Sequence, residues 1–137
     1  MKIEELMTTD VRTCRASDPL SAAVQMMWDG DCGAVVVCDD ERRVIGMLTD
    51  RDACMAGHLR GAPLWALTVG DAMAKVIYAV GANGKLATAV DLMKKHQVRR
   101  LPVVDESGKL AGLLTLGGLA QIAAGKAKGK KKAPTAG

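Results

Sequence analysis

One short stretch of this sequence combines hydroxyl, guanidinium and carboxylate groups at a spacing that suits anion binding. It is Thr49-Asp50-Arg51-Asp52, which follows the apolar run 44–48 and opens a predicted helix. Free backbone N–H groups and partial positive charge favour an anion at a helix N-terminus. Thr49 can hydrogen-bond a phosphate oxygen, Arg51 adds a positive charge, and Asp52 can accept from vicinal hydroxyls, as a carboxylate does with ribose. The alternative is an ordinary helix start in which Thr49 is only a cap.

Catalytic and metal-binding patterns are missing from the sequence. The two histidines, His58 and His96, stand outside any motif, and there is no Gly-x-x-x-x-Gly-Lys loop for phosphates. No Cys-x-x-Cys pair occurs among the four cysteines, which are Cys14, Cys32, Cys38 and Cys54. We therefore expect a protein that is not an enzyme, has no zinc site and keeps mostly buried, reduced thiols.

Composition narrows the class of protein further. Hydrophobic residues make up 49% of the 137 residues, which excludes a mainly disordered chain. Aromatic residues make up only 2%, which argues against a platform that stacks the bases of single-stranded nucleic acid. No apolar run approaches the ~20 residues that span a bilayer, and the start of the sequence has no apolar signal segment. We expect a cytoplasmic protein with no membrane partner.

The positive charge belongs to the C-terminal end. The net charge is +4, and removing five lysines of the last twelve residues leaves −1; they are Lys126, Lys128, Lys130, Lys131 and Lys132. The composition of 126–137 predicts a basic disordered tail. Such a tail can bind nucleic acid only weakly and without sequence preference, and its simpler role is to keep the protein in solution.

The sequence contains an internal repeat at an offset of 66 residues, with nine identities between 20–49 and 86–115 and no insertion. The paired identities are Leu20/Leu86, Ala23/Ala89, Val24/Val90, Met27/Met93, Val37/Val103, Asp39/Asp105, Gly46/Gly112, Leu48/Leu114 and Thr49/Thr115. The first four pairs recur at i, i+3, i+4 and i+7, which places them on one face of a helix. Each half therefore holds the same supersecondary unit.

Both halves predict the order strand, helix, strand, strand, helix. In the first half the predicted strands are 11–14, 34–38 and 44–48, and in the second they are 76–80, 101–104 and 110–114. Asp18 or Asn83 is expected to cap the first helix, with Pro19 as its first helical residue. The last helix begins near Asp50 or Leu116.

The fold class is α+β, with repeat 1 over 1–58, a linker over 59–67, repeat 2 over 68–125 and the tail over 126–137. Leu64, Trp65 and Leu67 of the linker region are expected to pack on the core. Neither repeat of about sixty residues buries enough surface to be stable alone, so the functional unit is expected to be the pair.

Two segments, within this order of elements, resemble the motifs of CBS domains. They are Arg100-Leu101-Pro102-Val103-Val104-Asp105 and Gly46-Met47-Leu48-Thr49-Asp50-Arg51-Asp52. A tandem pair of these domains is called a Bateman module. The resemblance covers about residues 2–125. The sequence is also similar to small bacterial proteins that consist of one CBS pair, some of them linked to stress or hypoxia. The resemblance implies two repeats packed through their sheets about a pseudo-two-fold axis, with two clefts for AMP, ADP, ATP or related adenosyl compounds. It further implies a homodimer and an effector protein regulated in trans.

The resemblance also assigns residues to the ligand. Thr49, Arg51 and Asp52 are expected to hold ribose and phosphate, and basic residues at the positions of Arg99 and Arg100 reach a phosphate in related modules. The walls around a purine base are expected from Thr13 and Cys14 on one strand and from Ala34 and Val35 on the next.

The second repeat departs from the pattern, because Gly118 stands where an Asp equivalent to Asp52 is expected. In the first repeat, Val36 stands where Pro102 stands in the second. We expect two unequal clefts, with the better one in repeat 1. The lost Asp keeps open the alternative of a structural dimerisation module with degenerate clefts.

Two further expectations follow. Met26, Met27, Met93 and Trp28 exceed what one thin core can hide, which favours a homodimer formed by helical faces of both repeats. In a fold of this kind the strand with Cys14 lies close to the strand with Cys38, so these two cysteines are the candidate disulfide pair.

Overall fold

The computed structural model describes residues 1–75 and 78–123 and groups them into two compact units. The first-repeat unit contains 12–75, and the second-repeat unit combines 78–123 with the N-terminal segment 1–11. Each unit therefore includes the first residues of the other repeat: 1–11 of repeat 1 belong to the second-repeat unit, and 68–75 of repeat 2 belong to the first-repeat unit. The five tail lysines and the start of the predicted strand 76–80 lie outside the described residues.

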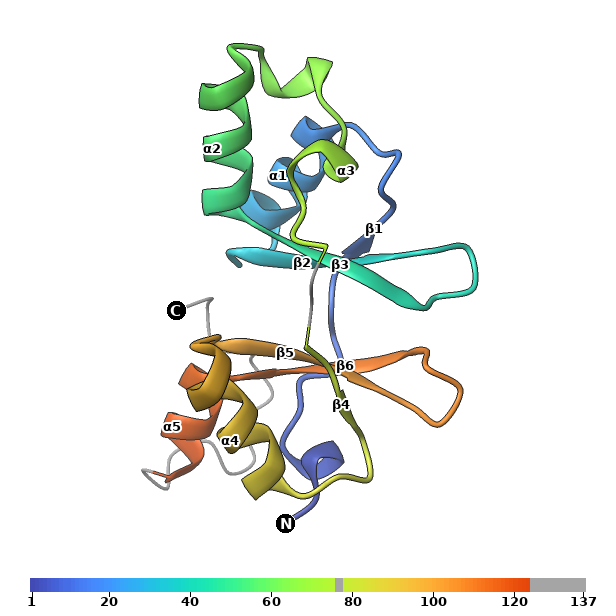
Figure 1. Cartoon of the computed structure of the whole chain (residues 1–137), viewed down its shortest axis with the longest axis vertical. Coiled ribbons are helices and arrows are strands. Elements are labelled where there is room, and N and C mark those ends of the chain that lie inside the picture. The colour runs from blue at the N-terminus through green and yellow to red at the C-terminus, as the bar shows by residue number, and fades with distance from the viewer. Residues whose placement is uncertain (76–77, 124–137) are drawn as a thin grey trace. The chain divides into compact units, whose positions relative to one another are not determined.

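The first-repeat unit has a three-stranded sheet with its helices on one face (Figure 1). The central strand β2 pairs in parallel with β1 and antiparallel with β3. Its elements are β1 (Thr13–Cys14), α1 (Leu20–Asp29), β2 (Ala34–Cys38), β3 (Val44–Thr49), α2 (Asp50–Arg60), the 3₁₀ turn η2 (Leu64–Ala66) and α3 (Val69–Ala72).

The second-repeat unit has the same topology, with β5 between a parallel β4 and an antiparallel β6. Its elements are the 3₁₀ turn η1 (Ile3–Glu5), β4 (Val80–Gly81), α4 (Leu86–His96), β5 (Arg100–Val104), β6 (Leu110–Thr115) and α5 (Leu116–Ala123). The predicted α+β class and the order of elements in both halves are confirmed.

The apolar positions shared by the two repeats form the cores. In the first-repeat unit Leu20, Ala23 and Met27 of α1 pack on Val35 and Val37 of β2. The corresponding core of the second-repeat unit joins helix α4 to strands β5 and β6, through Ala89, Met93, Leu101, Val103 and Leu114.

The structure corrects the expected apolar surplus. Met27 and Met93 are each only 4% exposed inside their own unit, and Met26 is half-buried against the first core. Trp28, in contrast, is 81% exposed. One unit therefore hides the methionines after all, because a flexible Met side chain fills irregular core space, and of this set only Trp28 remains as exposed apolar surface.

The shared aspartates close the hairpin between the last two strands of each unit. Asp39 Oδ1 accepts from the backbone N–H groups of Glu41 and Arg43, both at 2.9 Å. Asp105 Oδ1 accepts in the same way from Ser107 at 2.8 Å and Lys109 at 3.0 Å. This is how an Asp side chain stabilises a tight turn, and it explains why both repeats have Asp at this position.

Each shared glycine lies against the first residues of the other repeat. A Cβ at Gly46 would lie 2.8 Å from the carbonyl oxygen of Ala74 and 2.9 Å from Sδ of Met73. At Gly112 the distances are 2.8 Å to the oxygen of Thr8 and 2.7 Å to Sδ of Met7. The residue pairs 7/73 and 8/74 are also 66 apart, and Met7 and Met73 are identical, so the repeat extends into these segments.

The predicted starts of the first helices are wrong. Pro19 and Lys85 are the N-cap residues of α1 and α4, and neither helix has a side-chain cap. Asp18 instead accepts from the backbone N–H of Arg15 at 2.9 Å. The first backbone N–H of α1, on Leu20, donates to the carbonyl oxygen of Leu67 at 2.8 Å, so a residue distant in the sequence satisfies it.

The linker packs on the core only in part. Leu67 is 6% exposed and Leu64 packs against the first core, as expected, but Trp65 is 74% exposed. The 3₁₀ turn η2 points neighbouring side chains in different directions, so Leu64 turns inward and Trp65 outward.

Candidate functional site

The candidate site is the junction at which β3 ends and α2 begins. Thr49 is the N-cap, and its Oγ1 accepts from the backbone N–H of Asp52 at 3.0 Å. Asp52 Oδ2 accepts in return from the backbone N–H of Thr49, also at 3.0 Å. This is a capping box, so both residues have the structural role that the sequence left as the alternative.

The capping box leaves binding capacity at the junction. Thr49 and Asp52 are half-buried, and among the described residues no hydrogen bond to Oδ1 of Asp52 is formed. The helix behind them is eleven residues long, so its N-terminal dipole is developed. A ligand with hydroxyl groups can therefore bind the unused carboxylate oxygen without displacing the cap.

Strand β2 brings one further predicted residue to this junction. Ala34 is the register partner of Thr49, and the backbone N–H of Asp50 donates to the carbonyl oxygen of Gly33 at 3.0 Å. The start of β2 and the start of α2 are therefore held together by backbone hydrogen bonds, which fixes the position of Ala34 beside the cap.

The other predicted wall residues have different surroundings. Cys14 and Val35 belong to the packed core of the first-repeat unit, with 5% and 1% exposure. Thr13 is half-buried on β1 and pairs with Val36. A base at this site would thus meet Cys14 and Val35 mainly through their backbone groups.

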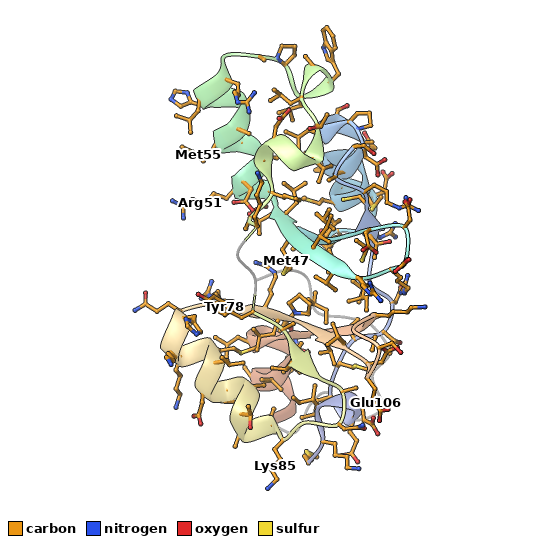
Figure 2. All side chains as sticks on the ribbon, turned by 45° about the vertical axis from the view of Figure 1, so that its right-hand side comes forward. Met47, Arg51, Met55, Tyr78, Lys85 and Glu106 are labelled. Carbon is orange, nitrogen blue, oxygen red and sulfur yellow. The ribbon has the colours of Figure 1, made fainter. Side chains whose placement is uncertain are left out.

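Arg51 extends from the outer side of α2 and is exposed (Figure 2). Its backbone N–H donates to Oδ1 of Asp50 at 2.8 Å. The guanidinium is therefore carried on a flexible side chain at the first turn of the helix, where it can add positive charge for an anion.

The second-repeat unit has the same junction with different chemistry. Thr115 Oγ1 accepts from the backbone N–H of Gly118 at 3.0 Å, so the threonine cap is kept while the returning carboxylate is missing. Arg100 pairs with Thr115 across the strands, and the carbonyl oxygen of Arg99 accepts from Leu116 at 2.8 Å. Arg99 and Arg100 thus occupy, in this unit, the places that Gly33 and Ala34 occupy in the first.

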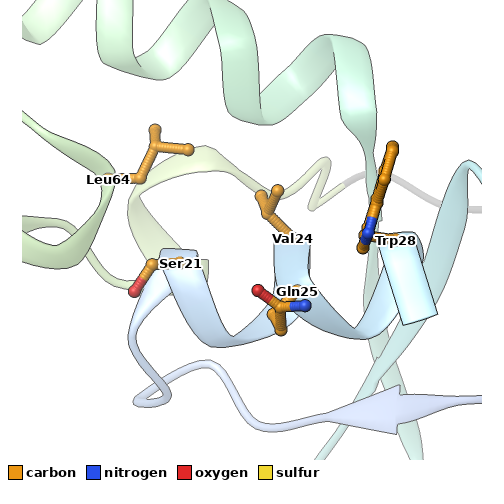
Figure 3. Close-up of a pocket in the computed structure, with 5 residues that line it drawn as sticks. All are labelled: Ser21, Val24, Gln25, Trp28 and Leu64. Carbon is orange, nitrogen blue, oxygen red and sulfur yellow. The ribbon is translucent and has the colours of Figure 1, made fainter.

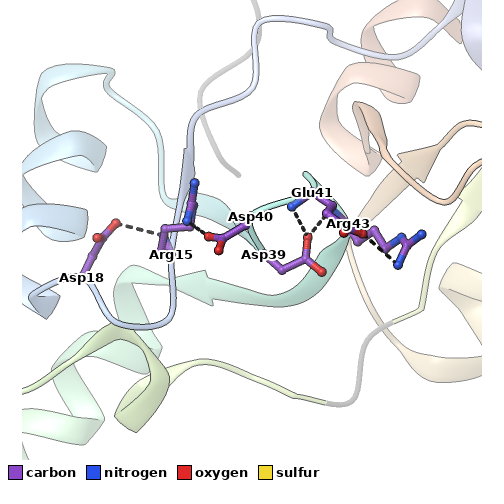
Figure 4. A network of polar contacts seen from close by, with 6 residues as sticks. All are labelled: Arg15, Asp18, Asp39, Asp40, Glu41 and Arg43. Atoms are coloured by element: carbon purple, nitrogen blue, oxygen red, sulfur yellow. Dashed lines mark hydrogen bonds and ion pairs between the residues drawn. The ribbon is translucent and has the colours of Figure 1, made fainter.

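An ionic cluster fixes the end of β1. Arg15 Nη1 forms an ion pair with Oδ1 of Asp40, in the hairpin between β2 and β3, while the backbone N–H of Arg15 donates to Asp18 (Figure 4). Both partners of the ion pair are exposed, so its contribution to stability is small. Its effect is to order the chain directly after Thr13 and Cys14.

The buried thiols are poor nucleophiles at neutral pH. Burial, together with the nearby Asp18 carboxylate and Cys38, raises the pKa of Cys14 from 9.0 to about 11. Burial also raises the pKa of Cys38. All four cysteines have free thiols in this structure, and the register places Cys14 opposite Val37. The Cys14–Cys38 disulfide stays a prediction.

The second-repeat unit contains an aromatic contact between residues that are distant in the sequence. The rings of Tyr78 and His96 are stacked, with centroids 3.7 Å apart and an interplanar angle of 9°. Tyr78 is the only tyrosine of the chain, but the two residues are far apart in the sequence and no local pattern signals their contact. Within residues 1–75 and 78–123, no group of three or more His, Cys, Asp or Glu is placed to share a metal ion.

Comparisons with known proteins agree with this architecture. The family model for the CBS domain matches twice, over residues 3–58 and 69–125. Hypoxic response protein 1 of Mycobacterium tuberculosis is 37% identical over 111 residues, which cover 81% of this chain and 77% of that protein. The chain therefore belongs to the CBS-domain family and consists of a tandem pair of these domains.

Solved structures share the fold. A crystal structure of Hypoxic Response Protein I with two coordinated zinc ions has a TM-score of 0.80 and 35% identity, and covers 88% of this chain and 98% of its own. The crystal structure of CBSX2 in complex with AMP has a TM-score of 0.79 and 26% identity, with 90% and 96% covered. Among the residues that the structure describes, no helix is long and apolar enough to cross a membrane.

Proposed function

We propose that this protein is a cytoplasmic, non-catalytic regulatory module that binds an adenosine-type nucleotide, works as a homodimer and acts on an effector protein in trans. The observation that carries the proposal is the β3–α2 junction, where Asp52 closes the capping box with one oxygen and, among the described residues, forms no hydrogen bond with the other. The AMP complex of a neighbour with the same fold supports the choice of ligand.

Each part of the nucleotide has an assigned partner in this proposal. Oδ1 of Asp52 accepts hydrogen bonds from the ribose hydroxyls, because an ionised carboxylate is the strongest acceptor available there. The phosphate is bound by the N-terminus of α2 with Arg51, and Arg99 and Arg100 are the proposed phosphate ligands at the corresponding junction of the second-repeat unit. The base lies along the backbone of Thr13, Cys14, Ala34 and Val35.

The two repeats are proposed to differ in ligand affinity. Only the first has the Asp that can accept from ribose, while Gly118 removes this acceptor from the second. We expect one strong nucleotide site per chain. The presence of Gly118 in place of this Asp also favours the competing function, a structural dimerisation module whose ligand sites have degenerated.

Asp52→Asn tests the site with little change to the helix start, because the amide oxygen can still accept from the backbone N–H of Thr49. A hydrogen bond to a charged group contributes about 1.5–3 kcal/mol, so we expect the nucleotide Kd to rise by roughly 10- to 100-fold. The matched control is Asp71→Asn, since Asp71 forms the same capping box with Thr68 at the start of α3. This control should leave the Kd unchanged.

Calorimetry and thermal shift with a panel of adenosine and guanosine nucleotides provide the readout. A nucleotide at about 100 times its Kd stabilises the wild-type protein by about 2.7 kcal/mol, which raises Tm by several degrees. If no nucleotide of the panel gives binding heat or a change in Tm at millimolar concentration, nucleotide binding is refuted. The competing function, a structural dimerisation module, is then the one that stands. Tighter binding by Asp52→Asn would show that Asp52 faces the phosphate and not the ribose.

A further inference from the structure

The first helix of each unit ends against a planar side chain from the segment before the first strand. In the second-repeat unit this is the ring of Tyr78, which is stacked on His96 with centroids 3.7 Å apart. The residues 66 positions earlier are Arg12 and Gly30, and they are in contact too: a Cβ at Gly30 would lie 2.9 Å from Cζ and 3.0 Å from Cδ of Arg12. The contact is therefore repeated in both units, with a guanidinium in the first where the second has a phenol ring.

Gly30 allows this guanidinium to lie directly on the end of α1. The three atoms nearest to a Cβ at Gly30 all belong to Arg12, and Nε is the closest of them. A larger residue would therefore displace the side chain. The backbone at Gly30 is helical, with φ of −91°, so its conformation does not require glycine. The small residue at this position thus serves the placement of Arg12.

The sheet register places Arg12 beside the candidate site. On one side of β2, the carbonyl oxygen of Arg12 accepts from the backbone N–H of Val36 at 3.1 Å. On the other side, Ala34 of β2 pairs with Thr49, the cap of α2. Because neighbouring strands are about 4.8 Å apart, the backbone of Arg12 lies about 10 Å from that of Thr49. A base that lies along Thr13 and Ala34, as proposed above, therefore reaches Arg12.

Arg12 differs from two nearby arginines in having no acidic partner. Arg15 and Arg43 form ion pairs with Asp40 and Glu41. Arg12 is exposed and, within the described part of the chain, forms no ion pair. A guanidinium is planar and only weakly hydrated, so it stacks on flat rings such as nucleobases. Arg12 offers such a plane, held against the backbone on one side and exposed to a ligand.

A second exposed planar side chain near the end of α1 is Trp28. It lies two residues before Gly30 and therefore points to a different side of the helix. Trp28 lines an open hollow (Figure 3) with Ser21, Val24, Gln25 and Leu64. None of these five residues is charged, so the hollow offers no charged group to a phosphate. The planar group that a nucleotide at the β3–α2 junction can reach is thus Arg12.

We propose that Arg12 stacks on the base of the nucleotide bound at the first-repeat site; the inference rests on the nucleotide binding proposed above and adds the side chain that recognises the base. Asp52 then binds the ribose, and the guanidinium plane binds the ring. A larger ring overlaps more with this plane, so the site prefers purine to pyrimidine nucleotides. Tyr78 has the equivalent place in the second-repeat unit, and aromatic rings also stack on bases.

Arg12→Lys and Arg12→Tyr separate stacking from charge. Lysine keeps the positive charge and loses the plane, whereas tyrosine keeps a plane and is the residue of the second repeat at this position. Base stacking contributes a factor of about 5 to 150 in affinity, so the Kd of AMP should rise by such a factor in Arg12→Lys and stay within about threefold of wild type in Arg12→Tyr. Calorimetry gives these values. Ribose 5-phosphate, which lacks the base, should displace AMP with the same Kd from all three proteins.

Gly30→Ala tests the placement of the guanidinium without changing Arg12. The new methyl group would displace this side chain from the end of α1, and alanine adopts the backbone conformation of Gly30 without strain. We expect AMP binding to weaken as in Arg12→Lys, with no fall in Tm. The matched control is Arg43→Lys, since Arg43 is also exposed and pairs with Glu41 in the hairpin between β2 and β3. This control should leave the Kd of AMP unchanged.

Failure of the stacking and failure of nucleotide binding give different results. If wild type binds AMP and Asp52→Asn binds it less tightly, while Arg12→Lys and Gly30→Ala bind AMP as tightly as wild type, the stacking is overturned and the nucleotide function stands. If Arg12→Tyr loses affinity for AMP while Arg12→Lys keeps it, or if ribose 5-phosphate is weakened along with AMP, Arg12 contacts the phosphate through its charge and the stacking is overturned. A wild-type protein that binds no nucleotide refutes both.

Discussion

Replacing Gly46 by Ala tests how closely the first residues of one repeat pack on the sheet of the other. The new methyl group would lie 2.8 Å from the carbonyl oxygen of Ala74, a backbone atom, and 2.9 Å from Sδ of Met73. Sδ can move because the Met side chain is flexible, but the oxygen is fixed by backbone hydrogen bonds between Met47 and Ala74 of 3.2 and 2.8 Å. Overpacking of this kind destabilises by about 1–3 kcal/mol.

Gly81→Ala is the matched control for this prediction. No atom lies within 4 Å of a Cβ at Gly81, which is also a strand residue and has no positive φ. Alanine there lowers the entropy of the unfolded chain, so we expect stabilisation of about 0.4–1 kcal/mol, of opposite sign to Gly46→Ala. Gly112→Ala, placed against Thr8 and Met7, should behave like Gly46→Ala.

Urea unfolding followed by circular dichroism measures these changes in the free energy of unfolding. Tryptophan fluorescence adds a probe of the first-repeat unit, which contains both tryptophans. If Gly46→Ala and Gly81→Ala change stability by the same amount and sign, the close approach of residues 73–74 to β3 does not restrict this position. The account of the repeated glycines would then be wrong.

Three further measurements follow from the titrating groups. Because the pKa of Cys14 is raised from 9.0 to about 11, its contribution to stability is complete below pH 9 and is lost, by about 3 kcal/mol, as the pH rises towards 11. The free energy of urea unfolding should therefore fall more steeply with pH over this range in wild type than in Cys14→Ala. Equal slopes would contradict the burial of this thiol. The same raised pKa makes Cys14 slow to oxidise, so mass spectrometry after denaturing alkylation without reductant should find four alkylated cysteines, whereas two would support the Cys14–Cys38 disulfide. The cap hydrogen bonds from Thr68 lower the pKa of Asp71 below its ordinary 3.8, with a smaller contribution from Arg60. The contribution of Asp71 to stability is present above pH 3.8 and is lost as the pH falls through the lowered value. The stability of Asp71→Asn should therefore depend less on acid pH, which an acid titration followed by circular dichroism checks.

Much of the candidate site was predictable because its determinants are local. Thr49 and Asp52 are three residues apart, and a threonine followed by a carboxylate at that distance forms a capping box at a helix start whatever the rest of the fold. The arginines at the start of β5 were visible as charges before an apolar run. Which oxygen of Asp52 stays unused, and that Cys14 and Val35 point into the core, required the packed structure.

By itself, the sequence determined the repeat, the type and order of the elements and the apolar faces of α1 and α4, because periodicity, turn residues and identities at one offset act over short distances. Only the tertiary structure decided the features that depend on distant parts of the chain. The starts of α1 and α4 are satisfied by carbonyl groups of Leu67 and Met1 instead of by the predicted side chains. The structure also decided that 1–11 and 68–75 each belong to the unit formed by the other repeat. It likewise decided that Trp28 is exposed while the adjacent Met27 is buried, because only one of the two side chains faces the core. A local pattern states what a side chain can do, whereas its neighbours in space decide which of these roles it takes.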